Sequence, residues 1–141
     1  MSQEILNKFK KFPNIFSAKS IYTMASVDFS YNDIDGFEGA EDGTYNGIKV
    51  STLTLNNNPY LTKYPKCLAE TNSTVGYVSL RGCSIDEIPE GSFVYENSPA
   101  LMSLDLSYNK LEKLPREIHA GNLPYLYGVE LSYNQFKEFP W

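Results

Sequence analysis

The sequence predicts a repeat solenoid with a parallel sheet along one side. A short motif, apolar-x-apolar-Ser-Tyr-Asn, occurs three times, at residues 27–32, 104–109 and 129–134. Two degenerate copies lie between them in the same register, at 53–58 and 78–83. A partial copy opens the chain, and the last positions of all copies follow one another at intervals of 25 or 26 residues. One supersecondary unit is therefore repeated along almost the whole chain.

The first element of each unit is expected to be a strand with one buried face. In the fullest copy, residues 104–106 alternate between apolar and polar, which is the pattern of such a strand. Beyond Asn109 the apolar residues lie at wider intervals up to Ile118, which favours a turn and then an irregular or short helical return segment. Pro115 fixes φ at the start of that return, where its missing N–H costs little.

The last residue of each motif is expected to join neighbouring units. A side-chain amide can bond backbone groups of two adjacent turns at once, so stacked copies satisfy loop backbone that would otherwise be buried unpaired. Cys83 can supply only a weak version of these bonds, so the middle of the ladder is expected to be softer. The ladder positions are Asn7, Asn32, Asn58, Cys83, Asn109 and Asn134.

Each of five copies also carries an apolar triplet, and the whole pattern L-x-x-L-x-L-x-x-N-x-L-x-x-L-P resembles the leucine-rich repeat family. The resemblance covers essentially the whole chain and fits typical repeats of 25 or 26 residues. It implies an α/β solenoid shaped as a horseshoe, with a parallel β-sheet on the concave face and irregular or short helical return segments on the convex face. It also implies protein recognition through the concave face. The return segments resemble those of bacterial surface or secreted members. The triplets are Met24/Val27/Phe29, Val50/Leu53/Leu55, Val75/Val78/Leu80, Leu101/Leu104/Leu106 and Leu126/Val129/Leu131.

The repeat spacing predicts a single array over residues 1–141. It consists of a partial repeat at 1–23 and repeats that start near 24, 50, 75, 101 and 126, the last of them incomplete. Apolar residues stand at both ends, where a solenoid normally carries a polar capping unit. We therefore expect a piece of a longer array. The alternative is that the ends stack on another chain, including end-to-end self-association.

Composition and charge argue against several classes of protein. The formal net charge is −5 and there is no basic face, so nucleic acid is not expected as a partner. No apolar run has transmembrane length, so insertion into a membrane is not expected. Two cysteines give no disulfide framework, and Met1–Pro13 lacks the apolar core of a secretory signal. The sequence does not assign a compartment. If the chain is excised from an exported bacterial protein, it is secreted or lies at the cell surface.

The strand residues that alternate with the core are expected to form a protein-binding face. Equivalent residues of neighbouring strands lie about 4.8 Å apart and so form rows. Tyrosines in these rows offer contact area with a polar tip, and carboxylates favour a basic partner. The same alternation places Ser107 outward, so Ser107→Ala is expected to cost little. Alternatively, Ser-Tyr-Asn is only what the repeat tolerates at an exposed strand end. The predicted partner-binding residues are Asp28, Tyr31, Tyr77, Arg81, Asp105, Tyr108, Glu130 and Tyr133.

Three other features could indicate chemistry. The acidic stretch at 33–42 has oxygen ligands but not the spacing of a calcium loop, so a solvated loop is the better interpretation. Asn72-Ser73-Thr74 fits an N-glycosylation acceptor. His119 is the single histidine and falls in a return segment, so we expect no catalytic pair, metal or cofactor there.

The sequence thus predicts a non-enzymatic module that recognises a protein partner through the concave face. Two alternatives remain open. The chain could be a structural spacer in a longer protein whose activity lies elsewhere, or an array that targets an attached catalytic domain such as a ligase.

Overall fold

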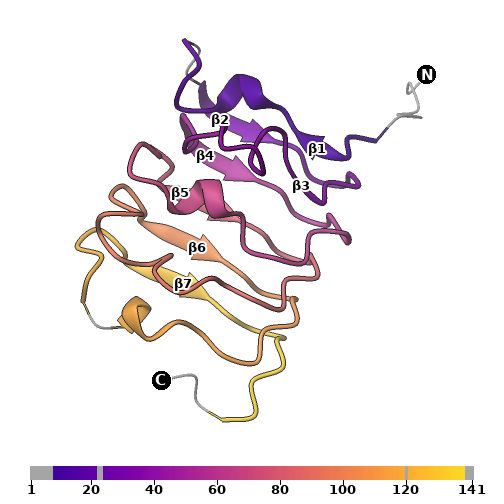
Figure 1. Cartoon of the computed structure of the whole chain (residues 1–141). Helices are drawn as coiled ribbons and strands as arrows, with labels where there is room; N and C mark the ends of the chain where they lie inside the picture. Colours follow the sequence, from indigo (N-terminus) through magenta and orange to yellow (C-terminus); the bar gives the residue numbers. More distant parts are fainter. Residues whose placement is uncertain (1–7, 22–23, 120, 139–141) are drawn as a thin grey trace.

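A computed structural model describes residues 8–21, 24–119 and 121–138. The chain winds as a solenoid with its strands stacked along one side (Figure 1). The predicted ladder residue Asn7 and the terminal Trp141 lie outside the described residues.

Among the described residues, the main sheet has five parallel strands, as the repeat pattern predicts. The register pairs Val27 with Leu53, Leu53 with Val78, and so on through Leu104 to Val129, so each unit places the same residue in the same position. In spatial order the strands are β2 (Met24–Asp28), β4 (Val50–Thr54), β5 (Tyr77–Ser79), β6 (Ser103–Asp105) and β7 (Gly128–Glu130).

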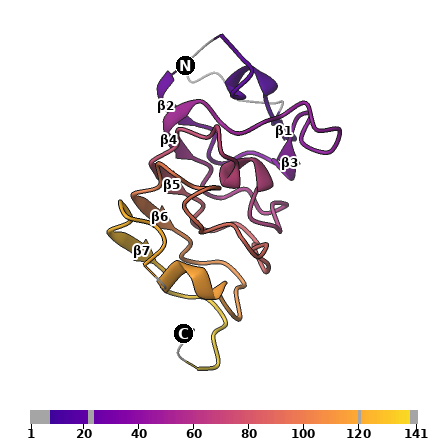
Figure 2. The same cartoon turned by 60° about the vertical axis from the view of Figure 1, so that its left-hand side comes forward.

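The return segments lie on the side opposite the sheet and contain only short elements (Figure 2). Two of the helical turns directly follow a proline whose φ is −65° or −63°, at Pro13 and Pro65, which suits entry into a helical turn. No helix among the described residues is long and apolar enough to cross a membrane. The short helices are η1 (Asn14–Phe16), η2 (Lys66–Ala69) and η3 (Arg116–His119).

The first two units are joined by a second, smaller sheet that the sequence does not predict. Strand β1 (Lys11–Phe12) pairs in parallel with β3 (Gly36–Phe37) on the return side. Aromatic rings fill the space beneath it: the Phe12 ring lies 4.7 Å from Phe37, 5.2 Å from Phe16 and 5.2 Å from Phe29. This end of the core is therefore packed by phenylalanines where later units use leucine and isoleucine.

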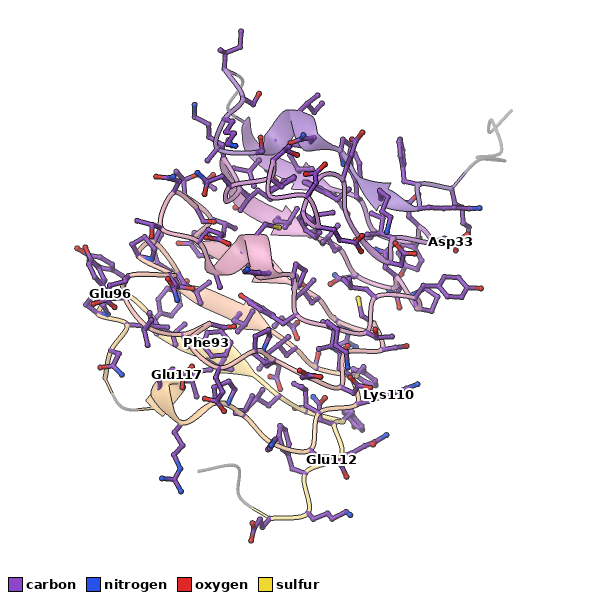
Figure 3. All side chains as sticks on the ribbon, in the orientation of Figure 1. Asp33, Phe93, Glu96, Lys110, Glu112 and Glu117 are labelled. Carbon is purple, nitrogen blue, oxygen red and sulfur yellow. The ribbon has the colours of Figure 1, made fainter. Side chains whose placement is uncertain are left out.

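The inward residues of the strands form one continuous core between the sheet and the returns. Leu53, Leu80 and Leu106 are fully buried, and Phe93 packs against Tyr64 from the return side with ring centroids 5.5 Å apart (Figure 3). Leu131, the equivalent of Leu106 in the unit of β7, is only partly buried. Because a repeat unit has too little apolar surface to stand alone, each stabilises its neighbours by stacking.

The ladder asparagines connect each turn to the preceding unit. Asn109 is nearly buried, and its Nδ2 donates to the carbonyl oxygens of Leu80 at 2.8 Å and Leu106 at 3.0 Å. Its Oδ1 accepts the Ile85 N–H at 2.9 Å. Equivalent bonds connect Asn32, Asn58 and Asn134 to the units before them. One side chain thus satisfies backbone groups of two turns.

Cys83 makes one part of this pattern. Its Sγ donates to the Leu55 carbonyl at 3.2 Å, the bond that Nδ2 makes in other units, but a thiol is a poor acceptor for the N–H that Oδ1 receives elsewhere. The preceding turn does not need this acceptor. Its Leu61 N–H donates to the main-chain carbonyl of Asn58 at 3.1 Å instead of to a ladder side chain. Leu61 is buried and Tyr60 is exposed, so Leu61 is the core residue of that turn.

Candidate protein-binding face

The sheet register brings the outward residues of the strands into rows. Asp105 of β6 lies directly beside Glu130 of β7, whereas Asp28 of β2 is separated from them by β4 and β5. Across the described strands the row runs Asp28, Thr54, Ser79, Asp105 and Glu130. The predicted carboxylates therefore stand in one row, as two adjacent groups and one separate group.

Each of these carboxylates accepts the N–H of the serine two residues further on, and two of them also accept that serine's hydroxyl. Oδ1 of Asp105 accepts the Ser107 N–H at 2.9 Å and the Ser107 hydroxyl at 2.6 Å. Oε1 of Glu130 accepts the N–H and hydroxyl of Ser132 in the same way. The hydrogen bonds from Ser132, with a smaller contribution from the charge of Arg81, lower the pKa of Glu130 below its ordinary value. These bonds therefore favour the carboxylate form of Glu130.

The tyrosine just before each ladder asparagine has a left-handed backbone. Tyr31, Tyr108 and Tyr133 have φ of 59°, 58° and 59°. The equivalent positions of the two other units hold Asn57, at 59°, and Gly82, at 71°. Glycine adopts this conformation freely and asparagine with little penalty, but other residues lose roughly 1–2 kcal/mol there. Three units retain tyrosine against this cost, which favours a role for the side chain over mere tolerance.

Arg81, Tyr108 and Tyr133 form a single stack across the ends of β5, β6 and β7, which we call the aromatic stack. The guanidinium carbon of Arg81 lies 4.2 Å from the centroid of the Tyr108 ring. The ring of Tyr108 lies 4.4 Å from that of Tyr133 at an interplanar angle of 16°. Three of the predicted partner-binding residues are thus in mutual contact, in the cation–π and stacked geometries that are favourable for such groups.

Ser107 faces outward as expected, but it is buried rather than exposed. The residue is fully buried, and Nη1 of Arg81 donates to the Ser107 Oγ at 3.2 Å. The same hydroxyl donates to Asp105. Ser107 therefore relays a hydrogen bond between a cation and a carboxylate of the face.

Tyr77 is the first residue of the central strand β5, at the opposite end of the strands from the aromatic stack, and it is exposed. Its hydrogen bond with Tyr127 raises the pKa of Tyr127, a residue that the sequence analysis did not include in the face. The contact is possible because Ser103 and Gly128, the residues in line with Tyr77 on β6 and β7, are small. In the sequence, the position of Tyr127 directly before the strand at Gly128–Glu130 was the one signal that could have placed it on the face.

Tyr31 is separate from the aromatic stack and borders a shallow hollow of about 410 Å³ on the same face. Asn57 and Gly82 take the two positions between Tyr31 and Tyr108, so the row of tyrosines is open there. Tyr31 is correspondingly 72% exposed, against 42% for Tyr108. The hollow is lined by Asp28, Ser30, Tyr31, Thr54, Asn56, Asn57 and Arg81.

The acidic stretch at 33–42 is distributed among separate partners. Asp35 pairs with Lys11 at 2.7 Å, and Asp33 lies 3.9 Å from the ammonium of Lys8. Asp33 belongs to the turn that follows the sheet, on the same side as Lys110 and Glu112 (Figure 3). Within the described residues, no three or more histidine, cysteine or acidic side chains are grouped to hold a metal ion. The side chain of His119 lies outside the described part of the chain.

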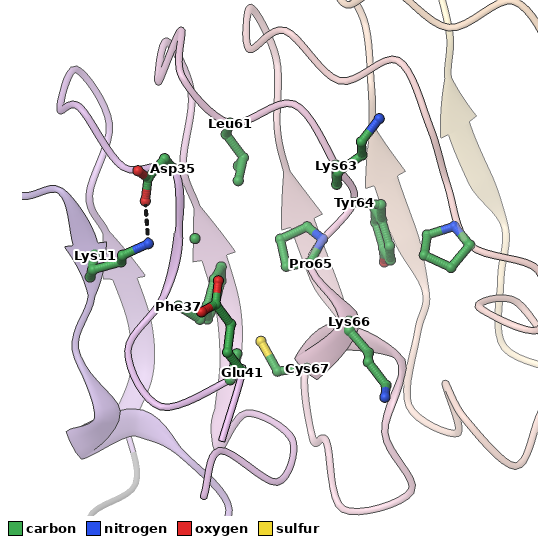
Figure 4. A pocket seen from close by; sticks show the side chains of 13 residues that line it. Lys11, Asp35, Phe37, Glu41, Leu61, Lys63, Tyr64, Pro65, Lys66 and Cys67 are labelled. Carbon is green, nitrogen blue, oxygen red and sulfur yellow. Dashed lines mark ion pairs between the residues drawn. The ribbon is translucent and has the colours of Figure 1, made fainter. Parts of the chain in front are cut away.

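A second hollow of about 300 Å³ lies between neighbouring return segments (Figure 4). Cys67 and Tyr64 line it, and burial raises the pKa of both well above its ordinary value. A buried neutral thiol is a weak nucleophile, so this cysteine has the character of a core residue. The Tyr64 hydroxyl has no hydrogen-bond partner among the described residues.

The parallel sheet, the asparagine ladder and the short returns define a solenoid built of leucine-rich units. The Leucine Rich Repeat family matches the chain at residues 100–120. The chain is a leucine-rich-repeat protein, as the sequence resemblance indicates.

Two similar proteins with solved structures are bacterial. A leucine-rich repeat protein from Bacteroides eggerthii is 42% identical, with a TM-score of 0.80 over 95% of this chain. One from Bacteroides thetaiotaomicron is 41% identical, with a TM-score of 0.78 over 95% of this chain. The mouse leucine-rich repeat-containing G-protein coupled receptor 5 is 37% identical over 67 residues, 48% of this chain. The chain spans 23% and 17% of the two bacterial proteins and 7% of the receptor.

Proposed function

We propose that the chain is a non-enzymatic recognition module that binds a protein partner through the concave face of the solenoid. The observation that carries the proposal is the left-handed backbone of three exposed tyrosines, Tyr31, Tyr108 and Tyr133. Each is retained at roughly 1–2 kcal/mol above what glycine would cost, and none of the three rings is buried in the core. Stacking within the chain offsets part of this cost for Tyr108 and Tyr133, whereas Tyr31 contacts no other ring among the described residues, so contact with another molecule best explains why the column keeps tyrosine.

The chemistry of the face indicates what such a partner carries. The adjacent carboxylates Asp105 and Glu130 repel each other, and the single positive charge of Arg81 nearby balances only one of their two negative charges. The chain as a whole has a net charge of −5. Basic groups on the partner would relieve that repulsion and would be steered toward the face.

The test is a selection of peptides from a random displayed library on the purified chain. The affinity of the selected peptides is then measured for wild type and for Tyr108→Ser/Tyr133→Ser. The matched control is Tyr60→Ser/Tyr95→Ser, which removes two exposed tyrosines that lie outside the sheet. We expect the first variant to lose at least tenfold in affinity and the control to lose less than twofold.

The main alternative is a structural spacer in a longer leucine-rich-repeat protein. It is favoured by the small share of the bacterial relatives that the chain spans. Under this alternative, equal binding by wild type and by Tyr108→Ser/Tyr133→Ser is the expected result. The same outcome would remove the support for the recognition proposal.

A further inference from the structure

The row of tyrosines is interrupted where the sheet face is hollow. Tyr31 stands at one side of the hollow, and the guanidinium of Arg81, backed by Tyr108, stands at the other. Asn57 and Gly82 replace the two rings that the repeat would otherwise place between them. The gap is therefore built by specific residues within a regular array.

The width of the gap suits one flat group. Three strand spacings separate Tyr31 from Tyr108, roughly 14 Å in total. Arg81 takes up 4.2 Å of this distance on Tyr108, which leaves roughly 10 Å between the Tyr31 ring and the guanidinium. An aromatic ring stacks at about 4.5–7 Å between centroids and accepts a cation within about 6 Å, so a single ring placed between them satisfies both distances.

The chain itself contains the same arrangement next to the gap. Tyr108 lies between Arg81 on one face and Tyr133 on the other, at 4.2 and 4.4 Å. A ring inserted into the hollow would have Arg81 on one face and Tyr31 on the other. The order along the sheet would then be ring, inserted ring, cation, ring, ring, without interruption.

The other lining groups select among possible occupants. Asp28 and Arg81 face the hollow from different sides, so an acidic occupant meets the carboxylate and a basic one meets the guanidinium. Thr54 and Asn56 supply polar groups. The Ser30 N–H binds Oδ1 of Asp28, whereas Oδ2 accepts no hydrogen bond from any described residue. A neutral ring with a polar N–H or O–H satisfies all of these groups, and an aliphatic side chain does not.

We propose that this hollow binds an exposed tyrosine or tryptophan side chain of the partner protein, stacked between Tyr31 and Arg81 with its polar tip toward Asp28. The proposal deepens the proposed function and rests on it for the partner. The hollow itself is tested with a small probe, so the two can fail independently.

The experiment is an NMR titration of the isotope-labelled chain with N-acetyl-tyrosinamide, with N-acetyl-leucinamide as the matched aliphatic probe. The reporters are the Arg81 Nε–H and the side-chain amides of Asn56 and Asn57. The decisive variant is Asn57→Tyr, which places in the gap the residue that three sister units carry at the same φ, and so fills the site from within. Arg81→Gln is the second variant, and it removes the cation from one wall.

We expect saturable shifts at these reporters with the tyrosine probe and none with the leucine probe. We also expect the apparent Kd to rise at least tenfold in Asn57→Tyr and at least threefold in Arg81→Gln. The second variant provides the test if the first folds poorly. Equal shifts with both probes, or unchanged binding in both variants, would overturn the proposal. If the tyrosine probe binds but peptide affinity is unchanged in Tyr108→Ser/Tyr133→Ser, the proposal for the hollow stands and only the proposed binding face is refuted.

Discussion

Leu106→Ala tests whether the units depend on one another for their stability. Leu106 is fully buried between the units of β5 and β7, and removing three carbons costs about 2.4 kcal/mol at about 0.8 kcal/mol per CH₂. A residual void of roughly 50 Å³ adds about 1.2 kcal/mol at about 24 cal/mol per Å³. We therefore expect a loss of about 3.5 kcal/mol in the free energy of unfolding.

The assay is urea denaturation followed by circular dichroism. With a slope of about 2 kcal/mol per M, the midpoint should fall by about 1.8 M. The matched control is Leu131→Ala, the same position one unit further on, where the side chain is only partly buried and about 1–1.5 kcal/mol should be lost. A loss below 1 kcal/mol for Leu106→Ala, or an equal loss for both variants, would refute the argument that stacking between units stabilises the array.

Three further changes have specific expected outcomes. Ser107→Ala should cost about 1–3 kcal/mol by urea midpoint, because Arg81 and Asp105 both lose a buried partner; a change within 0.5 kcal/mol would contradict the observed geometry. Asn109→Ala should destabilise by more than about 2 kcal/mol and Asn109→Cys by clearly less, since a thiol can still donate one bond; equal losses would argue against the ladder. Burial raises the pKa of Cys67, and a pKa raised on folding contributes stability that is complete below the unfolded value and is lost above it. The free energy of unfolding should thus fall above about pH 8.5, and this fall should be weaker in Cys67→Ala. Urea titrations from pH 7 to 10 measure both proteins, and an identical pH profile would count against a neutral buried thiol.

The sheet and its core could be predicted from the sequence because both follow directly from the repeat period. Once Val27, Leu53 and Leu104 share one position in the unit, parallel pairing places them side by side, and the register of the structure does so. A period of 25 or 26 residues also leaves room for only a strand, a turn and a short return. The similar proteins confirm the family resemblance and the parallel solenoid, both of which follow from this period.

Other features depend on side-chain geometry between units, which a repeat alignment does not contain. Ser107 alternates outward along its strand, yet it is buried, and a side chain from a unit 26 residues earlier donates to its hydroxyl. The β1–β3 pairing depends on how two returns approach each other. The left-handed backbone of the tyrosines had a visible signal, since the same column contains Gly82 and Asn57, residues that tolerate positive φ.

The most direct test of the central claim, that the concave sheet face is the binding surface, is a hydrogen-exchange footprint. Backbone exchange of the chain is compared with and without the tightest selected peptide. The account predicts slowed exchange at the ends of the strands and the following turns, in residues 28–31, 54–57, 79–82, 105–108 and 130–133, with the return segments unchanged. Slowed exchange confined to the returns, such as residues 59–70 and 86–97, would contradict it.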